Sequence, residues 1–523
     1  MKIVFGMIFG ILLSFDICAG EILKTAKIFG DNMVLQRDIP APVWGRAGPG
    51  EKVTVRFQGQ EKSAIADTDG KWMVRLDPLP ASTQPEKLTV TGKTGRQEFA
   101  NVVVGDVWLC SGQSNMQVNF GEVPQEAADV ECCPQIRLVN AGSSGVVPLP
   151  QDRVSPYGNW ISCSTNNLRG FSRVGYYFGL KLWQELRIPI GLVQAAAGCS
   201  SIEAWMPPES FAANQGWKDG NLAEMEEIQK VYREYKNYTN EEKERLFTEY
   251  FRSSYGWWAK FLLKKEKPVA EQYDGIFWHM LVIKSACLYN HAIRPIIPLG
   301  IKGAIWYQGE TNYRDNQYAQ KQQALVETWR KLWGEGDFPF YIVQIAPYKG
   351  GGVESIPGFW LEQYAAVSET KNSGIVSTID ISSDMDTQHP KNKRDVGLRL
   401  ALLALKDTYE RKDIVASGPT YKAMKITDGK IIVSFDNIGS GLTTKDGKVP
   451  DWFEIAGTNG HFVPAQAAIR GNTVEAGSPE AAQPEYIRYS WSGIADPNLR
   501  NKEGLPASPF NTAMPFFKGK KAE

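Results

Sequence analysis

The fold is decided by one stretch of sequence, VVVGDVWLCSGQSNMQ (102–117). It begins with a nearly continuous apolar run, as expected of a strand that is buried on both faces of a parallel sheet. The polar turn SGQSNMQ (111–117) follows at once. Ligands of α/β sheets gather beyond the carboxyl ends of the strands, so we expect a catalytic or binding group in this turn.

Further apolar runs of the same kind follow along the chain, with helical stretches between them. The runs are 188–196, 300–308, 340–346 and 374–381, and the helical stretches include 174–186 and 318–333. Buried strands that alternate with helices predict an α/β domain with a mainly parallel sheet, over residues 105–415. Within it, residues 209–275 are charged with apolar residues at helical spacing, which predicts a helical insertion.

β character predominates on both sides of this domain. Residues 21–104 alternate apolar and polar residues between Gly, Pro and Asp, which predicts a small sandwich-like β domain. The alternation returns after the central domain and predicts a second sandwich-like β region, over residues 416–523. The sequence leaves open whether the two regions pack on each other or separately on the central domain.

Residues 1–20 have the features of a secretory signal peptide. Lys2 supplies the positive charge, residues 3–13 form an apolar run too short to span a bilayer comfortably, and small residues close the segment. We therefore expect an exported bacterial protein that is periplasmic, at the cell surface or secreted. Cys18 leaves lipid anchoring as an alternative, although the two residues before it fit a lipobox poorly. No later segment predicts a transmembrane helix.

Composition and charge narrow the function classes. The 523 residues include 58 Lys and Arg against 58 Asp and Glu, so the net charge is zero, which argues against a nucleic-acid partner. Six cysteines follow the signal segment without a CxxC pair, which argues against a structural zinc site. Cys132 or Cys133 could pair with Cys163 in an oxidising compartment, or all six could be small buried hydrophobes.

Polar residues suited to acyl transfer follow four of the predicted strands. Ser114 is placed as a nucleophile whose own N–H can bind an oxyanion. Gly198 lets the backbone approach a substrate oxygen, and Gln308 can donate an amide hydrogen. Asp386 and His389 come from one loop, and a serine hydrolase needs such a base and a carboxylate to orient it.

Each of these residues also has a structural interpretation. A serine in a turn is more often a helix cap, and Gly198 suits any turn from a strand into a loop. Glu310 and Asn312 could cap the helix that follows them. The combination favours catalysis, because a random chain would rarely place Ser, Gly, Gln and Asp-x-x-His after successive strands.

The four loops resemble the four blocks of SGNH (GDSL-like) hydrolases, in their order, and resemble the sialate O-acetylesterase family still more closely. The motifs that carry the resemblance are GDVWLCSGQSNMQ (105–117), IEAW (202–205), IKGAIWYQGETN (301–312), HPKNKRDVGLRLA (389–401), NMVLQRDIPAPVWGRAGPGEKVTV (32–55) and GLPASPFNT (504–512). The resemblance implies an SGNH-hydrolase-like three-layer α/β domain with flanking β regions. It also implies hydrolysis of carbohydrate O-acetyl esters without a metal or other cofactor.

The resemblance further implies roles for individual residues. Ser114 is the nucleophile, His389 is the general base, and Asp386 is the acid that orients this base. The N–H groups of Ser114 and Gly198 and the side chain of Gln308 form the oxyanion hole. Candidate substrate contacts are Gln113, Asn115, Trp205, Glu310 and Asn312.

The sequence departs from the family pattern at three points. Gln308 stands where the broad SGNH pattern has Asn, which keeps an amide with one more methylene of reach. Glu310 is an alternative to Asp386, because related acetylxylan esterases use the glutamate of this QGE motif in their triad. Cys199 stands where the family tends to have Gly in a Gly-Gly-Thr block, and so lies near the site.

We therefore expect an exported serine esterase that removes acetyl groups from O-acetylated sialoglycans through an acetyl-serine intermediate. An esterase of the same fold that acts on acetylated xylan or another acetylated carbohydrate is the alternative. A non-catalytic glycan-binding protein is the alternative of another class. The four loops argue against it, because binding alone does not require Ser114 with Asp386 and His389.

Overall fold

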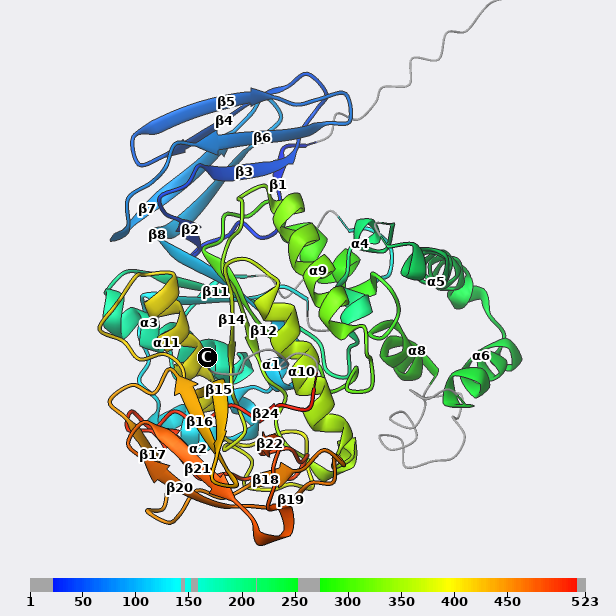
Figure 1. Cartoon of the computed structure of the whole chain (residues 1–523). Helices are drawn as coiled ribbons and strands as arrows, with labels where there is room; N and C mark the ends of the chain where they lie inside the picture. Colours follow the sequence, from blue (N-terminus) through cyan, green and yellow to red (C-terminus); the bar gives the residue numbers. More distant parts are fainter. Residues whose placement is uncertain (1–21, 143–145, 152–158, 213, 253–272, 515–523) are drawn as a thin grey trace, which may run out of the picture.

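The structure is a computed structural model that describes residues 22–142, 146–151, 159–212, 214–252 and 273–514. The predicted signal segment with Cys18 lies outside the described residues, as does part of the helical insertion. Figure 1 shows an N-terminal β unit, a central α/β unit with a projecting group of helices, and a C-terminal β unit. In these described ranges, no helix combines the length and the apolar character that a membrane crossing requires.

The N-terminal unit consists of short strands with alternating burial. The strands are β1 (Lys24–Thr25), β2 (Val34–Gln36), β3 (Ala41–Arg46), β4 (Lys52–Phe57), β5 (Gln60–Ile65), β6 (Lys71–Leu76), β7 (Ser82–Thr91) and β8 (Arg96–Gly112). One sheet has the order β1-β3-β6, while β4, β5 and β7 pair in a second layer that continues into β8. Every second residue of β4 and β6 is buried, so the two layers enclose one apolar core.

Strand β8 belongs to two units at once. Its first half alternates between exposed and half-buried residues and pairs antiparallel with β7, whereas all residues from Val102 to Gly112 are buried. The buried half is the central strand of the α/β sheet. One continuous strand therefore carries the chain from the N-terminal unit to the turn that follows Gly112 (Figure 1).

The remaining strands of the α/β sheet are β9 (Ile136–Asn140), β10 (Ile161–Ser162), β11 (Ile190–Ala196), β12 (Gly303–Tyr307), β13 (Phe340–Val343) and β14 (Ser373–Val376). Their order with β8 is β10-β9-β11-β8-β12-β13-β14. The pairs from β9 to β14 are parallel, and β10 pairs antiparallel at the edge. The carboxyl ends of β8, β11 and β12 therefore meet at one edge of the sheet.

Helices cover both faces of this sheet. The helices are α1 (Ser114–Gln117), α2 (Pro124–Asp129), α3 (Arg173–Leu186), α9 (Tyr318–Trp333), α10 (Ser355–Ser368) and α11 (Lys393–Asp407). Helices α3 and α11 share one apolar core with one face of the strands, and α9 and α10 share another core with the opposite face. Side-chain caps begin α3 at Ser172 and α11 at Asn392, where each side chain accepts a bond from a backbone N–H in the first turn.

The projecting helices of the insertion are α4 (Pro208–Ala212), α5 (Gln215–Glu234), α6 (Asn240–Arg252) and α8 (Tyr273–Leu281) (Figure 1). Short 3₁₀ segments are η1 (Phe120–Glu122), η2 (Leu168–Gly170), η3 (Ile202–Trp205), η4 (Tyr235–Asn237), η7 (Arg294–Ile296), η8 (Lys349–Gly351) and η9 (Pro479–Ala481). A π-helical segment, η6, spans Tyr289–Ile293. The insertion packs on the central core through aromatic residues such as Trp217 and Phe277.

The C-terminal unit has its own core. Its strands are β15 (Thr420–Thr427), β16 (Lys430–Asp436), β17 (Leu442–Thr444), β18 (Phe453–Ala456), β19 (Val463–Pro464), β20 (Gln466–Arg470), β21 (Thr473–Gly477), β22 (Tyr486–Tyr489), β23 (Leu499–Asn501) and β24 (Phe510–Asn511). Their sheets have the orders β15-β16-β21-β20, β17-β23 and β19-β18-β22-β24. The two β units lie at opposite ends of the molecule and pack separately on the α/β unit (Figure 1).

The six described cysteines are all free thiols, so the pairing of Cys163 with Cys132 or Cys133 is not formed in this structure. Cys163 instead donates a hydrogen bond to the hydroxyl of Tyr176, at 3.2 Å. Four of the six are buried, as small apolar side chains are.

Candidate active site

Ser114 lies immediately beyond the central strand, as the first residue of α1. The turn depends on Gly112, whose φ is +132° and whose missing Cβ would lie 2.2 Å from the Tyr307 carbonyl oxygen. The next residue, Gln113, donates its N–H to that same carbonyl at 2.9 Å. Only glycine allows this close approach of β8 to β12, and the approach sets where Ser114 projects.

Ser114 and His389 are brought together. His389 Nε2 lies 2.8 Å from Ser114 Oγ, although the residues are 275 positions apart in the chain. Burial, with the positive charge of Lys393 as the second cause, lowers the pKa of His389 to about 4. The imidazole is therefore neutral at neutral pH and can accept the serine proton.

Asp386 is not brought to His389. Its carboxylate is 74% exposed and accepts a hydrogen bond from Lys349 Nζ at 2.8 Å. The loop aims the two side chains in different directions, because the Lys349 backbone N–H holds the Met385 carbonyl at 2.8 Å and so turns this part of the loop toward Lys349. The structure therefore differs from the expected Asp386–His389 contact.

Gly198 faces the nucleophile. A Cβ at this position would lie 3.6 Å from Ser114 Cβ, so the glycine borders the space above the serine. Its backbone N–H donates to Gln117 Oε1 at 2.7 Å. A carboxamide oxygen thus occupies the donor that was expected to hold an oxyanion.

Gln308 has no amide hydrogen left for an oxyanion. Its side chain is fully buried, and Nε2 donates to the Ser200 carbonyl at 3.1 Å and to Asn312 Oδ1 at 2.8 Å. Its Oε1 accepts from the Tyr318 hydroxyl at 2.7 Å. The structure therefore gives Gln308 the role of tying the loop after β12 to the loop after β11, which differs from the expected donor role.

The expected substrate contacts are framework residues in this structure. Gln113 accepts from the Gly309 and Thr311 N–H groups at 3.4 Å, and Trp205 donates its indole N–H to Ser200 Oγ at 2.9 Å. Asn312 bonds Gln308 and Glu203, and Asn115 is described below. All five side chains, those of Gln113, Asn115, Trp205, Glu310 and Asn312, are buried and bonded within the loops, and their contact with substrate stays a prediction.

A buried polar network lies beneath Ser114. Asn115 Nδ2 donates to Glu310 Oε1, and Lys393 Nζ donates to Asn115 Oδ1 at 2.5 Å. Burial raises the pKa of Glu310 to about 7 and lowers that of Lys393 to about 7. Glu310 Oε2 is buried and has no hydrogen-bond partner among the described residues. Glu310 therefore contacts Asn115 and not His389 in the described hydrogen bonds.

Three further residues at the site, Gln117, Lys349 and Lys393, were not predicted from the sequence. Gln117 stands three residues after Ser114 in the same short helix, which places both on one side of that helix. Lys393 stands four residues after His389, in the HPKNK motif, and a lysine on the apolar side of a helix was the signal available for it. Lys349 lies on a distant loop and gave no signal.

Cys199 adopts the left-handed conformation, with φ of +62°, directly after Gly198. Burial raises the pKa of its thiol to about 12, so this thiol stays protonated at neutral pH. It therefore borders the site as a neutral group.

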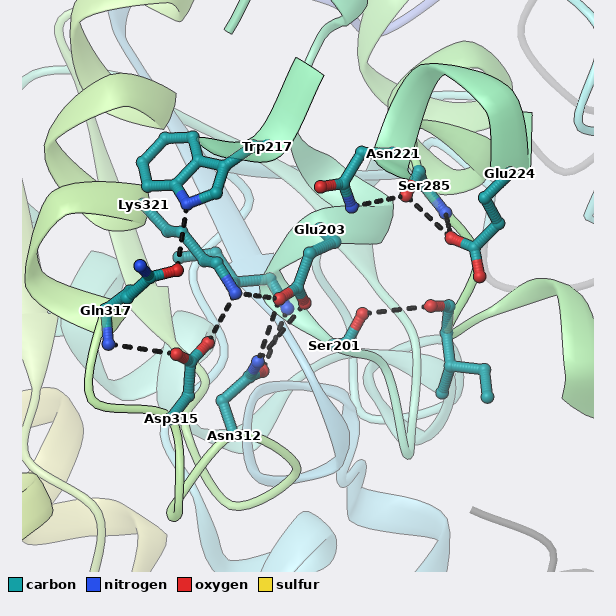
Figure 2. Close-up of polar contacts among 12 residues, drawn as sticks. Ser201, Glu203, Trp217, Asn221, Glu224, Ser285, Asn312, Asp315, Gln317 and Lys321 are labelled. Atoms are coloured by element: carbon teal, nitrogen blue, oxygen red, sulfur yellow. Dashed lines mark hydrogen bonds and ion pairs between the residues drawn. The ribbon is translucent and has the colours of Figure 1, made fainter. Parts of the chain in front are cut away.

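A second polar network joins the insertion to the loops behind the site (Figure 2). Lys321 donates to Glu203 at 2.6 Å and to Asp315 at 2.7 Å, and Glu203 also accepts from Asn312. From α5, Trp217 donates its indole N–H to Gln317 at 3.0 Å. The helical insertion and the loop that carries Gln308 are thus held in one arrangement.

Metal ligands and cavities were also sought among the described residues. In the ranges that the structure describes, no group of three or more His, Cys, Asp and Glu side chains could hold a metal ion.

A cavity of about 620 Å³ lies between the N-terminal unit and the α/β unit, lined by residues such as Trp44, Tyr289 and Arg294. Neither Ser114 nor His389 lines it, so it is separate from the candidate site.

Comparisons with known proteins point to one family. The family described as carbohydrate esterase, sialic acid-specific acetylesterase, matches residues 270–406. This match includes the loops of Gln308 and His389, whereas Ser114 and Gly198 lie before it.

Relatives match over nearly the full length. A sialate O-acetylesterase from Homo sapiens is 26% identical, over 97% of this chain and 96% of its own length. One from Rattus norvegicus is 28% identical over 78% of each chain. The crystal structure of a carbohydrate acetylesterase from Xanthomonas citri is 32% identical with a TM-score of 0.76, over 94% of this chain and 99% of that one.

Proposed function

This chain belongs to the carbohydrate esterase family of sialic acid-specific acetylesterases, and from that premise we propose that it removes O-acetyl groups from sialic acids with Ser114 as its nucleophile. The observation that carries the proposal is the 2.8 Å contact between Ser114 Oγ and His389 Nε2 beyond the central strand. Helices on both faces of the mainly parallel sheet support an SGNH-like arrangement.

In the proposed reaction, neutral His389 accepts the proton of Ser114 Oγ while this oxygen attacks the acetyl carbonyl carbon. The carbonyl π electrons move onto oxygen and form a tetrahedral oxyanion. When this intermediate collapses, the bond to the sugar oxygen breaks, and that oxygen takes the proton from His389. Water, deprotonated by the same His389, then attacks the acetyl-serine; the bond to Ser114 Oγ breaks, this oxygen takes the proton back from His389, and acetate is released.

We propose that the Ser114 and Gly198 N–H groups stabilise the oxyanion. Ser114 opens α1, so its N–H has no partner within the helix, and Gly198 borders the nucleophile. Each such donor contributes roughly 3 kcal/mol to the transition state. Because the Gly198 N–H is held by Gln117 Oε1, this carboxamide has to move when the substrate oxygen arrives.

Export is part of the proposal. The signal-like segment 1–20 would deliver the enzyme to the periplasm, the cell surface or the medium. Lipid attachment at Cys18 is the alternative form of export. Mass spectrometry of the mature protein separates the two, because a lipidated cysteine adds acyl mass at the new N-terminus.

The decisive experiment measures acetate release from O-acetylated sialic acid and, in parallel, from acetylated xylan. We expect release from sialic acid that disappears in Ser114→Ala and is unchanged by a metal chelator. Release from xylan alone would keep the serine mechanism and overturn the sialate assignment. Release that persists in Ser114→Ala would overturn the nucleophile.

The variant Asp386→Asn tests whether Asp386 is the triad residue that orients His389. Because Asp386 is exposed and bonds Lys349, we expect kcat to change by less than about threefold. A carboxylate that orients the base would cost about 10⁴-fold on amidation, so a fall of that size would restore Asp386 to the triad.

Hydrolysis of acetyl esters on other glycans is the second candidate. It is favoured by the Xanthomonas citri relative of known structure, which is described as a carbohydrate acetylesterase. The parallel xylan assay decides between the two candidates.

A further inference from the structure

The backbone on both sides of His389 is held by buried side chains. Asn115 Nδ2 donates to the carbonyl oxygen of Gln388 at 3.0 Å. Lys393 Nζ donates to the carbonyl oxygen of Pro390 at 2.7 Å. The peptide unit directly before His389 is therefore bound by a side chain from outside the loop, and the unit between Pro390 and Lys391 by a side chain from the helix that follows.

These two side chains are bound to each other and to Glu310. Lys393 Nζ donates to Asn115 Oδ1 at 2.5 Å, and Asn115 Nδ2 also donates to Glu310 Oε1. Lys393 lies 5.9 Å from the centre of the Tyr307 ring, which favours its positive charge. One connected unit thus spans α1, the loop after β12, and the start of α11.

This unit is costly to bury. Lys393 is 1% exposed, Glu310 is 4% exposed, and Asn115 is fully buried. Removing such groups from water costs several kcal/mol for each charge unless partners compensate, and Glu310 Oε2 lacks a partner among the described residues. None of the three has a place in the serine mechanism proposed above, so the cost calls for another role.

We propose that Asn115, Glu310 and Lys393 form a positioning unit that clamps the backbone on both sides of His389 and so holds its imidazole against Ser114. The inference rests on the proposed serine mechanism, in which this contact carries the reaction. It assigns to a network beneath the loop the orienting task that a triad carboxylate performs in other serine hydrolases.

The unit can hold His389 against Ser114 because Asn115 belongs to the helix that carries Ser114. Asn115 directly follows Ser114 in α1, so the same side chain that holds the Gln388 carbonyl also shares its backbone with the nucleophile. Any shift of the His389 loop relative to Ser114 would have to break a bond to Asn115 or Lys393. A misplacement of about 1 Å between reacting groups costs on the order of 100-fold in rate.

The charges that face the unit are mixed. Lys393 faces Glu310, Arg173 and Glu122, and its own charge lowers the pKa of His389. Burial raises the pKa values of Tyr307, Tyr318 and Tyr348, and the charge of Glu310 raises them further. Removal of Lys393 therefore has two effects, a looser loop and a higher pKa of His389.

The first test compares Lys393→Met with Lys391→Met. Methionine keeps the apolar stem of Lys393 and removes the bonds to Asn115 and Pro390, so we expect kcat to fall about 100-fold with KM changed less than about threefold. Lys391 is exposed in the same loop, and its variant should keep the parent kcat. An unchanged kcat in a folded Lys393→Met protein would overturn the proposal.

Glu310→Gln tests whether the carboxylate positions or orients directly. The glutamine oxygen can still accept from Asn115, so a positioning role predicts a kcat within about tenfold of the parent. Glu310→Leu cannot accept and should fall as far as Lys393→Met. A loss of about 10⁴-fold in Glu310→Gln alone would overturn the proposal and make Glu310 the triad acid.

Two readouts stay informative if a variant loses stability or the substrate assignment fails. The chain has 4 histidines, so the His389 ring signal can be followed by NMR, and its pKa should rise from about 4 toward the ordinary 6.5 in Lys393→Met. The rate at which a fluorophosphonate labels Ser114 should fall with kcat. An unchanged labelling rate in folded Lys393→Met would overturn the clamp, whether or not sialic acid is the substrate.

Discussion

Gln117 occupies in the free protein the N–H donor that the reaction needs. Its Oε1 lies 2.7 Å from the Gly198 nitrogen, so substrate has to break this hydrogen bond before the oxyanion can form there. A hydrogen bond of this kind contributes about 1 kcal/mol, which corresponds to roughly fivefold in an equilibrium constant. Gln117 is therefore an internal competitor of the acetyl oxygen.

We accordingly expect Gln117→Ala to raise kcat/KM about fivefold, measured as initial rates of acetate release. Gln117→Glu is the matched variant, because its carboxylate binds the same N–H more strongly and repels the oxyanion; its kcat should fall at least tenfold. A fall in Gln117→Ala would contradict the competitor role and show that the amide assists the transition state.

The low pKa of His389 predicts activity well into the acidic range. The base works when neutral, so kcat/KM should stay level down to about pH 5 and halve near pH 4, where a histidine of ordinary pKa would already be protonated. A half-point near 6.5 in the measured pH–rate profile would contradict the burial of His389 by this loop.

The same low pKa of His389 makes the folded protein less stable in acid. The unfolded chain takes up a proton on this histidine below about pH 6.5, whereas the folded chain does so only near pH 4. His389 therefore lowers the free energy of unfolding progressively as the pH falls from about 6.5 to about 4. Circular dichroism at each pH separates this loss of folded protein from the titration of the active base.

Single residues also show what the sequence could predict. Ser114 and His389 were recognisable because each follows a strand whose apolar run is plain in the sequence. Asp386 was expected to orient His389 because both share a loop, but spacing does not determine side-chain direction. The partner that draws Asp386 away, Lys349, is 37 residues distant, and such a pairing leaves no local pattern.

At the level of elements, helix α9 is attached to the loops after β11 and β12 by ion pairs. Lys321 of α9 is the centre of this attachment, held between Glu203 and Asp315 (Figure 2). These two carboxylates, with burial opposing them, raise the pKa of Lys321, so it is charged at neutral pH. Its loss leaves two half-buried carboxylates facing each other.

Lys321→Met should therefore lower the free energy of unfolding by about 3 kcal/mol, measured by urea denaturation. Lys331→Met, on an exposed turn of the same helix, is the control and should change it by less than about 0.5 kcal/mol. A loss in Lys321→Met as small as that of the control would show that the ion pairs are not structural.

Elements were easier to predict than their polar attachments. The apolar runs identified β8, β11, β12 and β13, because strands buried on both faces have little other interpretation. The role of Gln308 was not visible, since a polar side chain after a strand suits a catalytic donor and a loop tie equally well. Only the positions of Ser200, Asn312 and Tyr318 around it separate the two roles.

Across the whole molecule, the N-terminal unit and the α/β unit share both a strand and a buried charge. Asp106 of β8 is fully buried and accepts bonds from Gln36 at 2.9 Å, Arg37 at 2.9 Å and Tyr409 at 2.8 Å. The apolar core also runs without a break from the sandwich into the α/β unit. The two units should therefore unfold as one.

Asp106→Ala tests this unity, since it leaves Arg37 and the other donors without their acceptor. We expect a loss of about 3–5 kcal/mol in a single urea transition seen by fluorescence and circular dichroism alike. Asp77→Ala removes an exposed ion pair with Lys62 and should cost less than about 1 kcal/mol. Two separated transitions for the N-terminal and α/β units in the parent would contradict this coupling.

The shared strand has a further consequence for how the chain is made. Synthesis completes β8 at Gly112, yet its neighbour β12 is finished only at Tyr307. At roughly 5–20 residues per second, the edge of β8 that pairs with β12 stays unpaired for about 10–40 s. An open apolar edge recruits other nascent chains, so the folded yield depends on how this edge is shielded during translation as well as on the stability of the finished sheet.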